Sequence, residues 1–384
     1  MELKKIIQQY RLILTQKLMW GQERRAFVEV VMILLVGILW GLYNPNQVAE
    51  QLEISPKQLY ERLKELSARR WRRLLDQMML QAALERLKQY QEASAATRSR
   101  RQASLSIDDT VVKRLGSVLS YVWCWYSGQA KKVVKGQDLV GIVLRMGGEI
   151  IPLRLVWVSK QGRGSTSKPE VVLQAMAEVK EWFAQRGVDL TALGVSFDSW
   201  WVSEGFSRAL QDLGFTQQVI CGKGHLVLET EQGRRSLRAH RAEVELTVGW
   251  GHQTPAHRLR GRSPTFGAMV VVLFHHPRSK AYGLLCPARP LRTCEALRLW
   301  ANHHAVETFW KRLKRWLGLG QMQLRGRDGA WAELALRALA YLLALPLLGS
   351  VAATLAQLTH WLRRQGTFAD LVYEHFQLDL LGVS

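Results

Sequence analysis

Three acidic positions, far apart in the chain, have residue types that together suit phosphodiester chemistry. Asp108 and Asp109 follow one short apolar stretch, Asp198 follows another, and Glu307 lies in a basic, helical segment near the C-terminal end. Carboxylates at two strand ends and on a helix are the oxygen ligands that Mg²⁺ or Mn²⁺ ions need. Two such ions, roughly 3.5–4 Å apart, activate an attacking oxygen and stabilise a leaving one. We therefore predict that Asp108, Asp198 and Glu307 bind two metal ions.

The first carboxylate has two candidates. The spacing Asp108-x-Thr110 favours Asp108, whereas strand alternation after the apolar Ile107 favours Asp109. We prefer Asp108 and keep Asp109 as the fallback.

The segment around Glu307 predicts one functional helix face. Four residues fall within about 60° of one another on a helix of 100° per residue: Trp300, His303, Glu307 and Lys314. Further basic side chains follow at Lys311, Arg315 and Arg325, and we expect this face to contact DNA phosphates. A lone carboxylate among cations is usually an ion-paired surface group. The prediction that Glu307 binds metal therefore depends on the aspartates upstream.

Composition indicates an anionic partner. The chain has 53 Lys and Arg residues against 32 Asp and Glu residues, a formal net charge of +21. A surface this basic attracts polyanions, of which nucleic acid is the commonest, with an anionic membrane as the alternative. A hydrophobic content of 48% excludes a disordered chain. The four cysteines show no CxxC spacing, so we expect free thiols in a reducing cytoplasm.

Two apolar stretches raise the question of a membrane. Val30–Tyr43 is shorter than the roughly 20 residues that span a bilayer. Ala338–Thr359 is long enough, but it contains Pro346, and we interpret it as a buried helix. No membrane association is expected.

Residues 1–100 predict an all-helical DNA-binding domain. Within residues 44–66, Asn44-Pro45 and Ser55-Pro56 are two cap-and-proline helix starts, each followed by a Gln that completes a capping box. Two short helices joined by a tight turn are typical of a helix-turn-helix, whose second helix would present Lys57 and Tyr60 to the DNA major groove. A plain helical hairpin is the alternative.

Beyond the linker predicted at Ala93–Gln102, strands alternate with helices, which indicates an α/β core. We expect its first part at residues 101–214 and its last part, with the C-terminal helices, at 296–384. Residues 215–295 read as a β-rich insertion between them. Within the insertion, Arg258–Arg262 is predicted as a basic loop and Trp250 as a candidate for base stacking.

The motifs LSIDDT, FDSWW and W-x2-H-x3-E-x6-K occur in that order. Together they resemble bacterial insertion-sequence transposases with an RNase H-like core, in the group marked by a Tyr-x2-Arg-x3-Glu-x6-Lys signature. The resemblance extends to DDTVVKRLGS, WYSGQ and LGLGQMQLRGRDGAWAELALRALAYLL, and covers about Ser104 to Leu348. The chain departs from the signature at Trp300, where the family has Tyr, and at His303, where it has Arg.

The resemblance implies a fold and an activity. It implies an α/β RNase H-like catalytic core, interrupted by a β-strand insertion, with Asp108, Asp198 and Glu307 as the metal-binding triad and Lys314 at a DNA phosphate. It implies a dimer that binds the terminal inverted repeats of its element and joins their 3′-hydroxyl ends to target DNA, in a bacterial cytoplasm. The alternatives are an inactive, transposase-derived DNA-binding protein and a metal-dependent nuclease without strand transfer.

Overall fold

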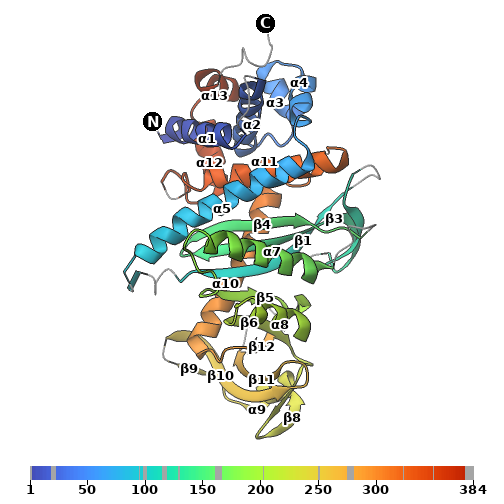
Figure 1. Cartoon of the computed structure of the whole chain (residues 1–384), viewed down its shortest axis with the longest axis vertical. Helices are drawn as coiled ribbons and strands as arrows, with labels where there is room; N and C mark the ends of the chain where they lie inside the picture. The colour runs from blue at the N-terminus through green and yellow to red at the C-terminus, as the bar shows by residue number, and fades with distance from the viewer. Residues whose placement is uncertain are drawn as a thin grey trace.

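The chain folds into a mixed α/β structure built on one long sheet (Figure 1). The computed structural model describes residues 2–18, 23–94, 96–97, 102–114, 119–128, 130–160, 167–201, 203–249, 251–274, 281–322, 324–348 and 350–376. Within these ranges, 12 strands pair in the order β2-β3-β1-β5-β6-β12-β11-β10-β7-β8, with β4 on β3 and β9 on β10. Parts of the predicted linker, at 95 and 98–101, and the candidate Trp250 lie outside the described residues.

The first half of the sheet combines antiparallel and parallel pairs. Its strands are β1 (Ser104–Lys113), β2 (Val122–Ser127), β3 (Lys132–Met146), β4 (Glu149–Trp157), β5 (Gly194–Phe197) and β6 (Gln218–Lys223). β1 runs antiparallel to β3 and parallel to β5, which in turn runs parallel to β6. Helix α7 (Lys168–Ala184) precedes β5, and α8 (Glu204–Asp212) follows it. The C-terminal ends of β1 and β5 therefore meet at one edge.

The predicted insertion extends the same sheet. Its strands are β7 (Val227–Thr230), β8 (Gly233–Ser236), β9 (Thr247–Gly249), β10 (His252–Ser263), β11 (Gly267–Phe274) and β12 (Ala281–Cys286). β6 falls inside the range predicted for the insertion, yet it pairs with β5, and β12 joins it from the other side. Arg258–Arg262 lies in β10 instead of a loop, because this arginine-rich segment pairs with the apolar β11.

The N-terminal helices share their core with the rest of the molecule. They are α1 (Glu2–Leu18), α2 (Glu23–Trp40), α3 (Pro45–Leu52), α4 (Pro56–Leu63) and α5 (Ala68–Glu92). α2 is buried along most of its length, and its side chains join one hydrophobic cluster with those of β1, β3 and the C-terminal helices. α5 crosses the sheet (Figure 1). The predicted N-terminal domain therefore has no hydrophobic core of its own.

The candidate helix-turn-helix comprises α3 and α4, as the capping signals predicted. Asn44 Oδ1 accepts the backbone N–H of Gln47 over 3.0 Å, whereas Ser55 makes no capping hydrogen bond through its side chain. Gln47 was predicted to complete a capping box with Asn44. Its side chain accepts the backbone N–H of Tyr43 over 2.7 Å instead. Glu53 takes a left-handed conformation, with φ of 54°, which turns the chain between the two helices.

The C-terminal part begins with α10 (Thr293–Lys311), which continues into the π-helix η3 (Arg312–Trp316). Helices α11 (Gly326–Ala344), α12 (Leu355–Arg363) and α13 (Phe368–His375) follow. The single buried helix predicted over 338–359 is broken instead: α11 ends at Ala344, before Pro346. Among the described helices, none alone is long and apolar enough to cross a bilayer. α2 and α3 together would suffice by length and composition, but the chain bends by 96° between them.

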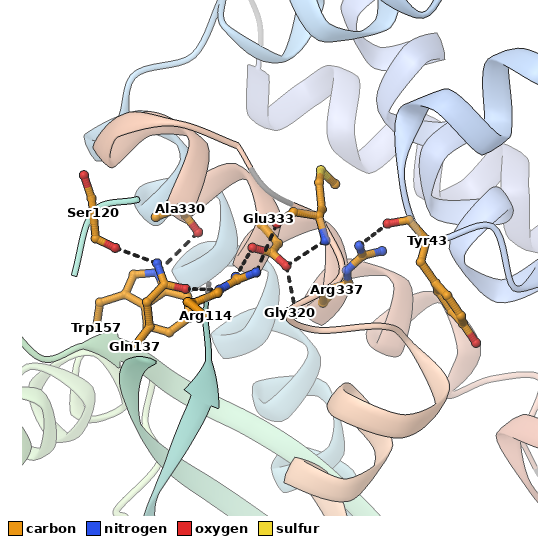
Figure 2. A network of polar contacts seen from close by, with 10 residues as sticks. Tyr43, Arg114, Ser120, Gln137, Trp157, Gly320, Ala330, Glu333 and Arg337 are labelled. Atoms are coloured by element: carbon orange, nitrogen blue, oxygen red, sulfur yellow. Dashed lines mark hydrogen bonds and ion pairs between the residues drawn. The ribbon is translucent and has the colours of Figure 1, made fainter. Parts of the chain in front are cut away.

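A buried polar network joins the end of β1 to these helices (Figure 2). Arg114, the residue after β1, forms an ion pair with Glu333 of α11. Glu333 Oε1 also accepts the backbone N–H of Gly320 over 2.9 Å, in the loop that follows η3. Arg337, further along α11, donates to the backbone oxygen of Tyr43, just before α3. Buried charges left without partners are costly, so the network holds β1, η3 and the start of α3 in one arrangement.

Candidate active site

Small residues let α10 lie directly on the sheet. A Cβ atom on Gly194 of β5 would come within 2.4 Å of Leu299, and one on Gly141 of β3 within 2.6 Å of Trp310. Between them, Ser106 donates to a backbone oxygen of α10 over 3.3 Å. A larger side chain at these positions would push α10 away from the strand ends. This close packing of α10 on the sheet was not predicted, because isolated Gly and Ser residues in strands do not show which helix they face.

Asp108 lies on the side of β1 that faces α10. Strand alternation places it with Ser106 and Thr110, whose hydroxyl groups contact α10 and η3. Its partner in register on β3 is Gly141, the glycine beneath Trp310. The half-buried carboxyl group of Asp108 therefore points to the same side as the helix that carries Glu307.

Asp198 lies beside Asp108. Ile107 and Phe197 are register partners in the parallel pair of β1 and β5, so the aspartates that follow them lie at neighbouring strand ends. Asp108, Asp198 and Glu307 all line one cleft of about 1550 Å³. Burial raises the pKa of Asp108 well above its ordinary range, and the nearby charges of Asp109, Asp198 and Glu307 raise it further. The three predicted carboxylates thus share one cleft and interact electrostatically.

Asp109 has a different environment, on the α7 side of β1. Its carboxylate accepts a hydrogen bond from Lys168 Nζ over 2.7 Å, and the same ammonium group lies 2.7 Å from the fully buried Asp138. Burial lowers the pKa of Lys168, but the two carboxylates raise it on balance. Asp109 therefore belongs to an ion-paired cluster at the start of α7, although it and Lys168 line the same cleft as Asp108.

Glu307 lies at the rim of the cleft. Its side chain is 56% exposed and contacts His304 Nδ1 at 3.0 Å, a contact that raises the pKa of His304. Among the described residues, no group of three or more His, Cys, Asp or Glu side chains is arranged to hold a metal ion. In this side-chain arrangement the predicted triad shares a cleft but does not converge on one metal position.

Lys314 lies inside the cleft, on η3. Its Nζ donates to Thr110 Oγ1 over 2.6 Å and to the backbone oxygen of Val111 over 2.8 Å. Burial lowers the pKa of Lys314 to about 8, although the charge of Asp108 opposes this shift. The π-helical turn places Lys314 against β1, two residues past Asp108.

Trp300 and His303 do not form the predicted DNA-contacting face. Trp300 is 9% exposed and His303 is 2% exposed, and their rings stack at 4.8 Å between centroids. Trp300 packs in a hydrophobic cluster with β6 and β10–β12, so the insertion covers it. Burial also lowers the pKa of His303. The helical wheel grouped these residues with Glu307 correctly by angle, but it carried no information on which strands would cover them.

The remaining predicted DNA contacts are on the surface, at separate places. Lys311 and Arg315 are exposed and line the cleft. Arg325 is exposed at the start of α11, outside the cleft lining. On α4, Lys57 is exposed and lies 3.7 Å from Glu61, and Tyr60 is half-buried.

The cleft wall opposite α10 contains aromatic and basic residues that were not predicted. Lys160 Nζ lies 4.1 Å from the centre of the Trp125 ring, and Lys168 Nζ lies 5.2 Å from that of Trp200. Trp200 is 63% exposed, in the turn just after Asp198. The sequence signals for this wall were the FDSWW motif, which contains Trp200, and the WYSGQ motif, which contains Trp125.

No protein-family model matches the chain, and a search of curated proteins found no match. The motifs therefore remain the basis of the family resemblance.

Proposed function

We propose that the chain is a DDE-type DNA transposase with an RNase H-like core. The mixed sheet supports this core, since it has aspartates at neighbouring ends of the parallel strands β1 and β5. The observation that carries the proposal is the cleft, which gathers Asp108, Asp198 and Glu307 from β1, the end of β5 and α10. The dimer, the terminal inverted repeats and the bacterial cytoplasm stay expectations from the resemblance.

The residues of the cleft suit Mg²⁺ or Mn²⁺. Asp108 and Asp198 offer only carboxylate oxygens. Burial raises the pKa of Asp108 most, and the neighbouring carboxylates add a repulsion that a divalent cation would relieve. Glu307 would complete the set, in competition with its His304 contact. Two bound ions would supply activation of the attacking oxygen and stabilisation of the leaving one.

The chain's own residues would hold and orient the DNA. Lys311, Arg315 and Lys314 lie on the α10–η3 side of the cleft, where cations bind backbone phosphates without reading sequence. Lys314 is tied to Thr110, so a phosphate held there lies close to Asp108. The exposed face of α4, with Lys57, supports duplex binding outside the cleft.

A non-catalytic DNA-binding protein is the second candidate. The contact between Glu307 and His304, which occupies the Glu307 carboxylate, favours it. It predicts salt-sensitive DNA binding with no Mg²⁺-dependent cleavage. A nuclease without strand transfer would cleave DNA but leave the released 3′-hydroxyl unjoined.

Strand cleavage and joining separate these functions. The assay uses duplexes with the inverted repeats that flank the reading frame, a target plasmid, and Mg²⁺ or EDTA. We expect Mg²⁺-dependent nicking and joining by the wild type, none by Glu307→Gln, and both by the control His304→Ala. If Glu307→Gln still cuts with Mg²⁺, the site assignment is wrong. If the wild type binds but never cuts, the second candidate is correct.

A further inference from the structure

A second groove lies beside the cleft, along α7. It has a volume of about 960 Å³ and is bounded by the start of α5, the start of β2, the end of β4 and the start of α11. Its lining includes Arg69, Arg72, Tyr121, Trp123 and Arg327. None of these residues takes part in the site described above.

Tyr121 is held rigidly in this groove. It has a φ of 62°, a left-handed conformation that is strained for a residue with a bulky side chain. Its ring stacks on Trp157, with 6.3 Å between centroids and 20° between planes. Its hydroxyl oxygen accepts hydrogen bonds from Trp331 Nε1 over 3.2 Å and from Arg327 Nε over 3.3 Å. The Arg327 guanidinium also lies over the ring, 5.9 Å from its centroid. The half-buried Tyr121 and Trp123 thus form, with Arg327, a pre-positioned surface of aromatic rings and a guanidinium plane.

The charge of the groove favours an anion. Arg69 and Arg327 are exposed, and neither forms an ion pair with the residues that the structure describes. Glu178, the acidic residue in the lining, lies 2.7 Å from Arg154 and 3.8 Å from Arg72. Arg69 and the terminal nitrogens of Arg327, whose Nε donates to Tyr121, therefore remain available to phosphates.

The groove adjoins the cleft. Ser159 lines both, and α7 contributes its first residues to the cleft and its next turns to the groove. The groove also reaches Arg69, in the first turn of α5, six residues after α4 ends. A strand lying in it would connect the carboxylate cleft with the candidate helix-turn-helix.

We infer that this groove binds a single strand of DNA where the duplex opens beside the cleft. The inference rests on the proposed function, since it extends the path of DNA from that site. Unpaired bases stack on aromatic rings with little sequence preference, while arginines hold the backbone. A duplex keeps its bases stacked on one another, so it cannot place them on Tyr121. The aromatic surface therefore selects an unpaired strand.

The test measures binding by fluorescence anisotropy, in EDTA and on an Asp108→Asn background. The probes are fluorescein-labelled oligo(dT) and a duplex of equal length, at several salt concentrations. For Arg69→Ala/Arg327→Ala, we expect the slope of log K against log salt with oligo(dT) to fall in magnitude by about 1.4, since each single-strand phosphate contact contributes about 0.7. The affinity for oligo(dT) should fall at least about tenfold, with less than a twofold change for the duplex.

The matched control is Arg186→Ala/Arg364→Ala, which removes the same charge from exposed positions outside the groove. It should leave the oligo(dT) slope unchanged. If both double variants lower the slope equally, or if the groove variant weakens duplex binding as much as oligo(dT) binding, the groove is not a single-strand site and the inference fails.

Photocrosslinking gives a readout that requires no variant in the groove. An oligonucleotide carrying 5-iododeoxyuridine should crosslink to Tyr121 or Trp123, as mass spectrometry of the peptides would show. Crosslinks confined to the cleft or to α4 would overturn the inference. Neither measurement requires cleavage. A chain that never cuts DNA but gives both expected results would refute the proposed activity and still support single-strand binding in the groove.

Discussion

Two groups of carboxylates lie on opposite sides of β1, and they differ in how their charge is balanced. On the α7 side, Lys168 lies 2.7 Å from both Asp109 and Asp138. On the α10 side, burial and then the nearby carboxylates raise the pKa of Asp108, and burial lowers the pKa of Lys314 to about 8. A group balanced by its own cation stabilises the fold, whereas a mutually repelling group suits an added cation. Both aspartates line the cleft, and the difference supports our proposal that Asp108 has the chemical role and Asp109 a structural one.

The largest expected effect comes from removing the charge of one aspartate at a time and comparing the loss of strand cleavage. Asp108→Asn should lower Mg²⁺-dependent strand cleavage by on the order of a thousandfold, the scale seen for residues that act directly on the reacting groups. Asp109→Asn should lower it by less than about tenfold, because its partner is Lys168. Single-turnover cleavage measures both. Equal losses in the two variants, at equal stability, would remove the distinction.

This distinction was only partly available from the sequence. The strand ends, the helix that carries Glu307 and the α3–α4 pair were predictable, because apolar periodicity and capping residues are local signals. Asp108 and Asp109 stayed ambiguous because alternation shows that neighbours face opposite sides, not what lies on each side. That depended on Lys168 and on α10, which are distant in the chain.

The errors have a related cause. Trp300 and His303 were predicted to contact DNA, but strands of the insertion bury Trp300. Arg258–Arg262 was predicted as a loop because of its charge, although pairing with β11 makes it a strand. In both cases a tertiary neighbour decided the outcome, and local composition could not indicate which neighbour it would be.

The second prediction concerns the balanced group. Lys168→Met should cost about 3 kcal/mol of unfolding free energy at neutral pH, because it leaves Asp109 and Asp138 buried without their cation. Burial already raises the pKa of Asp138 to about 7. Protonation on acidification should therefore relieve the repulsion, and the deficit should shrink from pH 7 to pH 5. Urea unfolding at both values measures it, and a deficit that grows on acidification would contradict the cluster.

The third prediction concerns the repelling group. The folded-state pKa of Asp108 lies above its unfolded value, so its stabilising contribution is present below about pH 4 and lost as the pH rises through the folded pKa. Without metal at pH 7, Asp108→Asn should melt about 2 °C higher than the wild type. Mg²⁺ should raise the melting temperature of the wild type and not that of Asp108→Asn. An equal Mg²⁺ shift in both would place the metal elsewhere.

The smallest expected effect tests the lysine of the repelling group. With its pKa lowered to about 8, Lys314 is charged at pH 7 and loses its proton as the pH rises towards 9. If its ammonium group binds phosphate, DNA affinity in EDTA should fall with pH above about 8, by at most about tenfold per pH unit. Lys314→Arg should bind without this decline, because arginine stays protonated in that range.

Lys57→Arg, on the exposed face of α4, is the matched control and should keep the wild-type profile. A wild-type affinity constant from pH 7 to 9, or a decline that persists in Lys314→Arg, would show that Lys314 anchors Thr110 and does not bind the substrate.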